Sequence, residues 1–282
     1  MEKAFDSIRQ IEGLTRQELE KISTDHLKSI YMGDHLLLCK ILGRYKIYVD
    51  SRDIGIASNL IMDGFWESWV TKFIVHNVKP GDICIDAGAH FGYYSLLLAE
   101  LSGKTGKTVA IEPNAHLSQL LSFTNVLNDF GFINIQKGLA DERGEVTLTV
   151  PLHFWGGGTI RKEKVDDHVT TQTVQVDTLD HLLEELELSK VDFIKMDCEG
   201  VEPLIFRGME KTLKNNPQLK MVMEFSPFMY KDPRSFTQFL FTRFSVGEIT
   251  GESTVRLFSE NDVDYLVNLP DHIDLFLQKK PV

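Results

Sequence analysis

The sequence predicts an α/β protein with an open, doubly wound and mostly parallel sheet of seven strands. Three observations predict it. From Asp82 onward, short apolar runs alternate with helical stretches, a pattern typical of parallel strands joined by right-handed crossovers. The first of these runs ends in a glycine turn, Asp86 to Gly92, which passes at once into a helical pattern. With 282 residues, 43% of them hydrophobic, the chain can bury one large core.

For the residues before the sheet, the sequence predicts a helix followed by a hairpin. Residues 1–30 place Leu, Ile and charged residues at helical spacing. Residues 35–53 predict a hairpin that turns near Gly43. A loop then leads to a helix from about Glu67, and Pro80 with the glycine after it ends this region.

We therefore expect two parts: residues 1–79 as an extension that mediates oligomerisation or covers the substrate, and residues 80–282 as the domain with the sheet. The expected parallel strands are residues 83–87, 108–112, 133–139, 192–197 and 219–225. The expected helices are residues 93–102, 115–130, 179–187 and 201–216. Extra strands are expected at 144–150 and 170–178, around a glycine-rich loop, and final strands at 244–250 and 264–270.

The amino-acid composition argues against some classes of function and cellular location. The net charge is −11 and there is no run rich in Lys or Arg, which argues against a protein that binds nucleic acid through its phosphates. The cysteines, Cys39, Cys84 and Cys198, have no zinc-binding spacing and fit a reducing compartment. No stretch approaches the roughly 20 apolar residues of a membrane span, and no apolar signal core opens the chain. We expect a cytoplasmic protein.

Carboxylates follow the ends of four expected strands: Asp86, Glu112, Asp197 with Glu199, and Glu224. Ligands of doubly wound sheets bind at these carboxyl ends. In the first turn, Gly88 can adopt backbone angles closed to other residues, and Gly92 lets the next helix pack closely against the strand.

This acidic ring favours a positively charged ligand. A dinucleotide brings a pyrophosphate, which prefers free backbone N–H groups, and the G-x-x-x-G spacing of Gly88 and Gly92 is not G-x-G-x-x-G. Glu112 can accept hydrogen bonds from a ribose diol, and Asp141 can accept one from an adenine amino group. S-adenosylmethionine combines adenine, ribose, ammonium and sulfonium, and matches this set of residues.

At these residues the chain resembles the FkbM-type family of class I S-adenosylmethionine-dependent methyltransferases. The resemblance rests on "VKPGDICIDAGAHFGYYSLLLA", on "VDTLDHLL" and above all on "VDFIKMDCEGVEPLIFRGMEKTL", and it covers residues 64–226. It implies a Rossmann-like fold and O-methylation of hydroxyls on sugars or secondary metabolites. The family usually has Asn where this chain has His90, and often His where this chain has Phe225.

The resemblance also implies which residues bind the cofactor. Carried over by position, they are Asp86, Gly88, Ala89, Gly92, Glu112 and Asp141. From the same segments we add His90, Tyr94, Asn114 and Ala140, and from the stretch "GFWESWV" we add Glu67, beside Trp66, at the mouth of the cofactor site.

Methyl transfer from a sulfonium is an in-line displacement, and a hydroxyl acceptor must also lose its proton. Asp197 or Glu199 is the expected base, because two nearby carboxylates can raise each other's pKa towards neutrality. His153 and His90 are the rival bases, and Lys195 either pairs with a carboxylate or is structural. We expect no metal, with a divalent ion on Asp197 and Glu199 as the alternative.

The acceptor is expected to be a small molecule or glycan, covered by residues 150–170. Trp155 can stack on a sugar ring, its glycine neighbours can hinge a lid, and His153 and Glu224 are the other expected acceptor residues. Two other functions stay open: a nicotinamide-dependent oxidoreductase, disfavoured by Asp86 and the glycine spacing, and a non-catalytic S-adenosylmethionine-binding module. Copies of the chain could associate through the N-terminal region.

Overall fold

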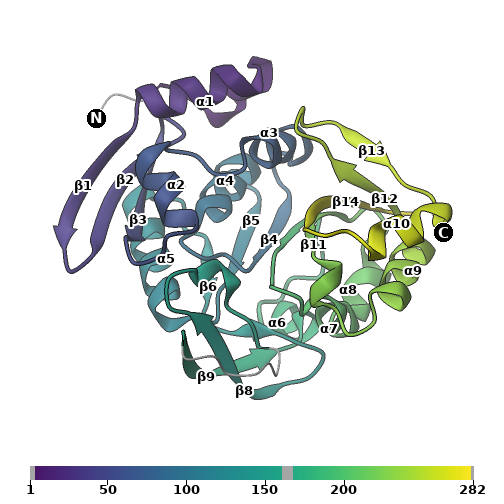
Figure 1. Cartoon of the computed structure of the whole chain (residues 1–282). Helices are drawn as coiled ribbons and strands as arrows, with labels where there is room; N and C mark the ends of the chain where they lie inside the picture. Colours follow the sequence, from purple (N-terminus) through teal and green to yellow (C-terminus); the bar gives the residue numbers. More distant parts are fainter. Residues whose placement is uncertain (1–3, 161–167, 281–282) are drawn as a thin grey trace.

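The α/β fold is confirmed in a computed structural model that describes residues 4–160 and 168–280 (Figure 1). The central sheet has the strand order β13-β12-β14-β11-β10-β4-β5-β6. Its parallel strands are β4 (Ile83–Ala87), β5 (Lys107–Ile111), β6 (Ile133–Ile135), β10 (Phe193–Met196) and β11 (Lys220–Phe225). Its antiparallel strands are β12 (Phe244–Ile249), β13 (Val255–Leu257) and β14 (Ile273–Lys279).

This sheet contains eight strands, whereas the sequence predicts seven. Two of the eight strands, β13 and β14, lie outside every expected strand, and β13 is a short edge strand that pairs with β12. The strand expected at residues 264–270 is wrong, because helix α10 (Val263–Val267) occupies most of that segment. Val263 and Leu266, three residues apart, are both buried in the core. Apolar residues at this spacing bury one face of a helix.

Helices cover both faces of the sheet, so the molecule has two main cores. On one face lie α3 (Ser68–Asn77), α4 (Tyr93–Ser102) and α5 (Ala115–Asn128). On the other lie α6 (Leu179–Glu185), α7 (Glu202–Arg207), α8 (Glu210–Asn215) and α9 (Pro233–Arg243). Successive side chains of a strand point to opposite faces of the sheet, so one strand contributes to both cores: Cys84 belongs to the first and Ile85 to the second.

The single helix expected at residues 201–216 is two helices, α7 and α8. The break includes Gly208, which lies against the backbone of Ala140: a β-carbon at Gly208 would stand 2.1 Å from the Ala140 carbonyl oxygen. This close approach places the end of α7 beside the segment that follows β7 (Gly138–Leu139).

The N-terminal residues pack on the first core. They form the 3-10 helix η1 (Ile8–Gly13), α1 (Arg16–Asp25), the antiparallel strands β1 (Lys28–Gly33), β2 (Leu36–Ile41) and β3 (Tyr45–Asp50), and α2 (Ile56–Met62). The hairpin with Gly43 at its turn is confirmed. The helix expected over 1–30 is wrong at its end, because β1 begins at Lys28 and pairs with β2, and α2 replaces part of the expected loop.

A small third sheet has the order β7-β9-β8 and contains β8 (Gly144–Pro151) and β9 (Val169–Asp177), which confirms both extra strands. The short 3-10 helix η2 (Trp155–Gly157) lies between them in sequence. The expected acceptor cover can be followed to Ile160, because residues 161–167 lie outside the described part. Within the described residues, no helix has both the length and the apolar character needed to cross a membrane.

The sheet reverses its winding between β4 and β10. These strands are parallel neighbours, with Ala87 opposite Met196, and the chain proceeds outward from them to β5 on one side and to β11 on the other. Loops leaving such neighbours turn to opposite faces and leave a crevice at the carboxyl ends. The side chains after Ala87 and Met196 therefore meet at this crevice.

Candidate cofactor and catalytic site

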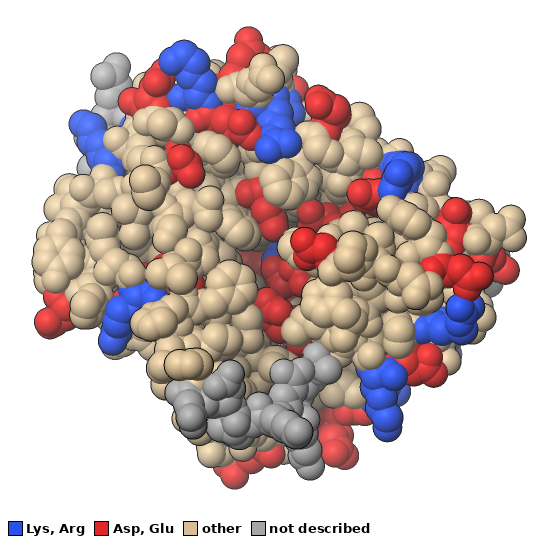
Figure 2. Space-filling model, viewed as in Figure 1, with Lys and Arg blue, Asp and Glu red and all other residues tan. Residues whose placement is uncertain are grey.

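A cavity of about 640 Å³ lies at the carboxyl ends of the parallel strands, within the usual range of roughly 300–1,000 Å³ for ligand sites. Its walls include the residues after β4, β5, β10 and β11, together with Trp66, Glu67 and Trp155. Figure 2 shows Asp and Glu side chains gathered in the central hollow of this face. The cavity is therefore acidic and bordered by aromatic side chains.

The glycine turn after β4 presses directly against the end of β10. Gly88 has a φ of 81°, and a β-carbon there would stand 1.8 Å from the carbonyl oxygen of Asp197. Gly92, with a φ of 94°, is the N-cap of α4. A β-carbon on Gly92 would lie 2.4 Å from Leu121, so this glycine lets α4 approach α5. Both glycines are required by the geometry.

Lys195 is the buried cation beneath the cavity. Its Nζ donates to Oδ2 of Asp197 at 2.8 Å and lies 4.9 Å from the centre of the Tyr94 ring. Burial alone would lower the pKa of Lys195, but the carboxylates of Asp197, Asp86 and Glu67 raise it above its ordinary value. Lys195 therefore stays charged and holds Asp197 in place.

Asp86 lies one layer below the cavity wall. It is 1% exposed, and its Oδ2 accepts a hydrogen bond from the Ser95 hydroxyl at 2.5 Å. Its Oδ1 has no hydrogen-bond partner among the described residues. Burial raises the pKa of Asp86. A buried oxygen without a partner leaves an acceptor for a ligand or a water molecule.

Glu112 and His90 are joined across the cavity wall. Glu112 accepts the backbone N–H groups of Asn114 at 2.8 Å and of His90 at 2.9 Å, one on each carboxylate oxygen. Burial raises the pKa of Glu112 to about 7. Burial lowers the pKa of His90 to about 4, because it disfavours the charged imidazolium. Neither ring nitrogen of His90 has a hydrogen-bond partner among the described residues. The neutral imidazole thus offers one donor and one acceptor to a ligand.

Asp197, Glu199 and Glu224 form a carboxylate cluster in which one oxygen of each lies within 4.8 Å of the others. Burial, followed by the charge of Asp197, raises the pKa of Glu199 to about 8 and that of Glu224 to about 10. The Ser226 hydroxyl donates to Glu224 at 2.7 Å. Glu199 and Glu224 therefore keep protons at neutral pH that an ordinary glutamate has lost, so the cluster can donate protons as well as accept them.

Glu67 enters the cavity from the N-terminal part of the chain. It caps α3 in a left-handed conformation, with a φ of 36°, and its Oε2 accepts from the Tyr94 hydroxyl at 2.6 Å. Burial and the nearby Asp274 raise the pKa of Glu67 to about 8. Trp69 donates its indole N–H to Asp274 at 2.9 Å, which fixes this wall.

The structure does not bring every expected residue to the cavity wall. Asp141 is held by Arg207 on α7 at 2.8 Å. Asn114 does line the cavity, but its side-chain oxygen accepts backbone N–H groups at the start of α5. The expected residues that are outside the described lining are Asp86, Ala89, Gly92, Tyr94, Ala140, Asp141, His153 and Lys195.

Other lining residues were missed, among them the polar residues Asn59, Ser226 and His272. Asn59 lies on α2, and Ser226 and His272 flank β11 and β14. None of these three belongs to a glycine turn, and only Ser226 directly follows an expected strand. The sequence offers no pattern for the other two.

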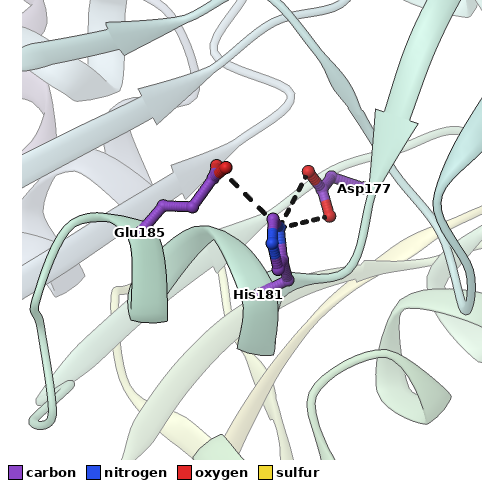
Figure 3. A group of neighbouring side chains, drawn as sticks. All are labelled: Asp177, His181 and Glu185. Carbon is purple, nitrogen blue, oxygen red and sulfur yellow. Dashed lines mark hydrogen bonds and ion pairs between the residues drawn. The ribbon is translucent and has the colours of Figure 1, made fainter.

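A second acidic and histidine group lies away from the carboxylate cluster (Figure 3). His181 points to Asp177 at 3.1 Å and lies 3.8 Å from Glu185. Lys137 already donates to Asp177 at 2.8 Å, and the buried Asp177 also accepts the backbone N–H of Thr178 at 2.9 Å. Lys137 thus already pairs with Asp177, and this group is a network of ion pairs and hydrogen bonds that ties β9 to α6.

Comparison with known proteins gives a family match over most of the chain. The sequence model of the methyltransferase FkbM domain matches residues 86–280. Among curated proteins, the hexuronic acid methyltransferase AglP of Haloferax volcanii is 23% identical over 149 residues, which are 53% of this chain and 59% of that protein. The chain therefore spans less than two thirds of that relative's length.

Solved structures give distant matches. An O-methyltransferase from Bacillus cereus in complex with SAH is 12% identical, covers 81% of this chain and 84% of its own, and has a TM-score of 0.42. Methanocaldococcus jannaschii Trm5 in complex with adenosine is 15% identical, with coverages of 89% and 58% and a TM-score of 0.44.

Proposed function

The chain belongs to the methyltransferase FkbM domain family, and from that premise we propose that it methylates a hydroxyl group of a sugar or glycan. S-adenosylmethionine is its cofactor. The observation that carries the proposal is the cluster of Asp197, Glu199 and Glu224 in an acidic cavity beside the Gly88 turn. Such a cluster can take a proton from a hydroxyl, which methylation of an oxygen requires.

The residues present fit this cofactor. The acidic wall suits a ligand with a sulfonium and an ammonium group, and the unpartnered nitrogens of His90 suit its polar atoms. Glu112, held by two backbone N–H groups, is fixed as an acceptor for ribose hydroxyls. When bound, S-adenosylmethionine supplies an electrophilic methyl carbon.

The chain's own residues supply position and proton transfer. The acceptor hydroxyl must lie in line with the methyl group, at about 3 Å from it. Asp197 or Glu199 accepts the hydroxyl proton, and a placed base of this kind contributes about 10²–10⁴ in rate. Lys195 keeps the Asp197 carboxylate fixed. Glu224, which holds its proton at neutral pH, donates a hydrogen bond to a neighbouring acceptor oxygen.

Aromatic side chains support a sugar as the acceptor. Trp66 and Trp155 line the cavity, and the faces of such rings pack against the apolar faces of sugars. The relative from Haloferax volcanii is a hexuronic acid methyltransferase by name. The net charge of −11 and the acidic cavity disfavour RNA, whose phosphates require cationic partners.

The test is product analysis with S-adenosylmethionine that carries a labelled methyl group. The panel contains neutral methyl hexosides, hexuronic acids and short RNA. We expect label in a sugar, in a form that resists mild alkali, because a methyl ether resists alkali whereas a methyl ester is cleaved. Label found only in RNA, or only in an alkali-labile ester, would overturn the proposal.

A further inference from the structure

One wall of the cavity is a loop, called the roof loop below, that is held in place by hydrogen bonds to residues outside the matched family region. The roof loop, residues 153–159, leads from β8 and places Phe154, Trp155 and Gly158 on the cavity wall. Residues 50–57, between β3 and the start of α2, lie against it. The family match begins only at residue 86, so this fastening is a property of the N-terminal segment of this chain.

Asp53 is the centre of the fastening. It is 0% exposed. Its Oδ1 accepts the backbone N–H of Trp155 at 3.1 Å and that of Gly55 at 3.2 Å, and its Oδ2 accepts that of Ala57 at 3.0 Å. The backbone N–H of Ile54 donates to the His153 carbonyl at 2.8 Å. One buried carboxylate thus joins the roof loop to the start of α2.

The Trp155 ring is held from two sides. The Arg52 guanidinium lies 5.4 Å from its centre, and the His116 ring on α5 meets it edge-on at 5.5 Å. Asp50 orients both neighbours, with bonds of 2.6 Å to Arg52 and 3.0 Å to His116. Burial alone would raise the pKa of Asp50, but these hydrogen bonds bring it below its ordinary value, so the anchor is charged at neutral pH.

The far end of the roof loop reaches the catalytic segment. The hydroxyl of Thr159 donates to the backbone carbonyl of Glu199 at 2.9 Å, and Thr159 itself is fixed by a β-bridge to Thr149 on β8. Glu199 has a left-handed φ of 54°, a conformation that neighbouring contacts must maintain. The roof loop therefore touches the backbone that aims one carboxylate of the cluster.

From these contacts we infer that Asp53 and Thr159 are positioning residues of the methyl-donor site. Asp53 holds the roof loop over the cavity, which slows release of the bound cofactor. Thr159, through its hydrogen bond to the Glu199 carbonyl, makes the backbone conformation of Glu199 depend on the position of the same loop. The inference rests on S-adenosylmethionine as cofactor and is independent of which acceptor the enzyme methylates.

The first experiment measures release of tritiated S-adenosylhomocysteine from the full chain by chase with unlabelled ligand. Asp53→Ala removes the hydrogen bond from the Trp155 backbone N–H in the roof loop and is expected to speed release about tenfold, the effect of losing one hydrogen bond to a charged group. Asp53→Asn retains one oxygen and is expected to lie between Asp53→Ala and the parent. Asp63→Ala, which removes a partly exposed carboxylate outside the cavity lining, is the matched control and should release at the parental rate.

Thermal unfolding shows which variants are folded, and Asp53→Asn carries the test if Asp53→Ala fails to fold. Release from a folded Asp53 variant at the parental rate would overturn the role of Asp53.

The second experiment tests Thr159 through the pH dependence of S-adenosylmethionine affinity, measured by calorimetry from pH 6 to 10. A cation binds more tightly as the carboxylate cluster ionises. The ammonium group of the ligand also titrates in this range, so Glu199→Gln serves as the reference at each pH, and the affinity of the parent relative to that reference is expected to rise with pH. Thr159→Val removes the hydroxyl at nearly constant volume and is expected to shift the midpoint of this rise, whereas Thr159→Ser restores it. An unchanged midpoint in folded Thr159→Val would show that Thr159 is only structural and would sink that half of the inference.

Discussion

The carbonyl oxygen of Asp197 lies 1.8 Å from the point where a β-carbon on Gly88 would stand. The end of β10 and the turn after β4 therefore share a contact that only glycine permits. Because Asp197 also carries the carboxylate bound by Lys195, this contact places a catalytic candidate directly beside the glycine turn. The glycine turn after β4 and the end of β10 therefore pack as one unit.

Gly88→Ala is expected to abolish binding of S-adenosylhomocysteine, because the new methyl group must displace either the turn or the Asp197 backbone. Calorimetry on the folded variant checks this. Gly131→Ala is the matched control: its φ of 66° imposes similar backbone strain, but nothing lies within 4 Å of its β-carbon position. Equal losses in the two variants would attribute the effect to strain and contradict the contact.

Asp197→Asn and Glu199→Gln test the proton acceptor. Each substitution keeps the side-chain shape and removes the base, so turnover is expected to fall about 10²–10⁴-fold in the variant that lacks the true base. Affinity for S-adenosylmethionine, measured separately, should change far less. Glu142→Gln, on an exposed residue, is the control. Full turnover by both cluster variants with the true acceptor would rule out Asp197 and Glu199 as the base.

The raised pKa of Glu199, about 8 because of burial and the charge of Asp197, predicts the pH profile. A carboxyl group is a base only after it loses its proton, so kcat/KM should rise with pH through a midpoint near 8 if Glu199 is the base. The Glu199→Gln variant should lose that rise. A parental profile that is flat from pH 6 to 9 would assign the base elsewhere.

Glu67 predicts an effect on stability. Burial and Asp274 raise its pKa to about 8, against an ordinary value of 4.5. A raised pKa in the folded state means that the stabilising contribution is fully present below about pH 4.5 and is lost as pH rises through 8. Glu67→Gln cannot ionise and should lose less stability between pH 5 and 9 than the parent in urea unfolding. A parallel decline in both proteins would contradict the shift.

Removal of divalent metal ions tests the alternative role of the carboxylate cluster. Lys195 already donates to Asp197 at 2.8 Å, and a second cation beside it would be repelled. We therefore expect turnover to be unchanged after dialysis against a chelator. Loss of turnover, with recovery on adding Mg²⁺ or Mn²⁺, would instead make Asp197, Glu199 and Glu224 metal ligands.

Most of the fold was predictable, because local signals and tertiary packing agree in the sheet. The strand 83–87 and the helix 93–102 match β4 and α4 residue for residue, since an apolar run, a glycine turn and a helical pattern follow one another there. Agreement fails at 201–216, where the contact of Gly208 with Ala140 accompanies the break between α7 and α8. A contact between distant segments leaves no local pattern.

In the candidate site, too, residues marked by a local sequence pattern were predictable and residues placed by contacts between distant segments were not. Glu112 and Glu199 line the cavity as the sequence predicts, because both follow strands whose ends meet in any doubly wound sheet, and their roles toward the cofactor and the acceptor stay predictions. The role proposed for Asp53 was not predicted from the sequence, because it depends on the roof loop about 100 residues further along the chain. Asp141 forms an ion pair with Arg207, and its expected contact with adenine stays a prediction. Association of copies through the N-terminal segment stays a prediction.

The β8–β9 hairpin has its own ladder, from Gly144 opposite Val176 to Pro151 opposite Val169, and its sheet is separate from the central one. Its internal pairing does not depend on the strands that carry Asp197 or Glu112. Sequence changes along the two strands of this hairpin can therefore be tolerated without disturbing the central sheet, whereas a change at Thr159 is transmitted to the backbone of Glu199.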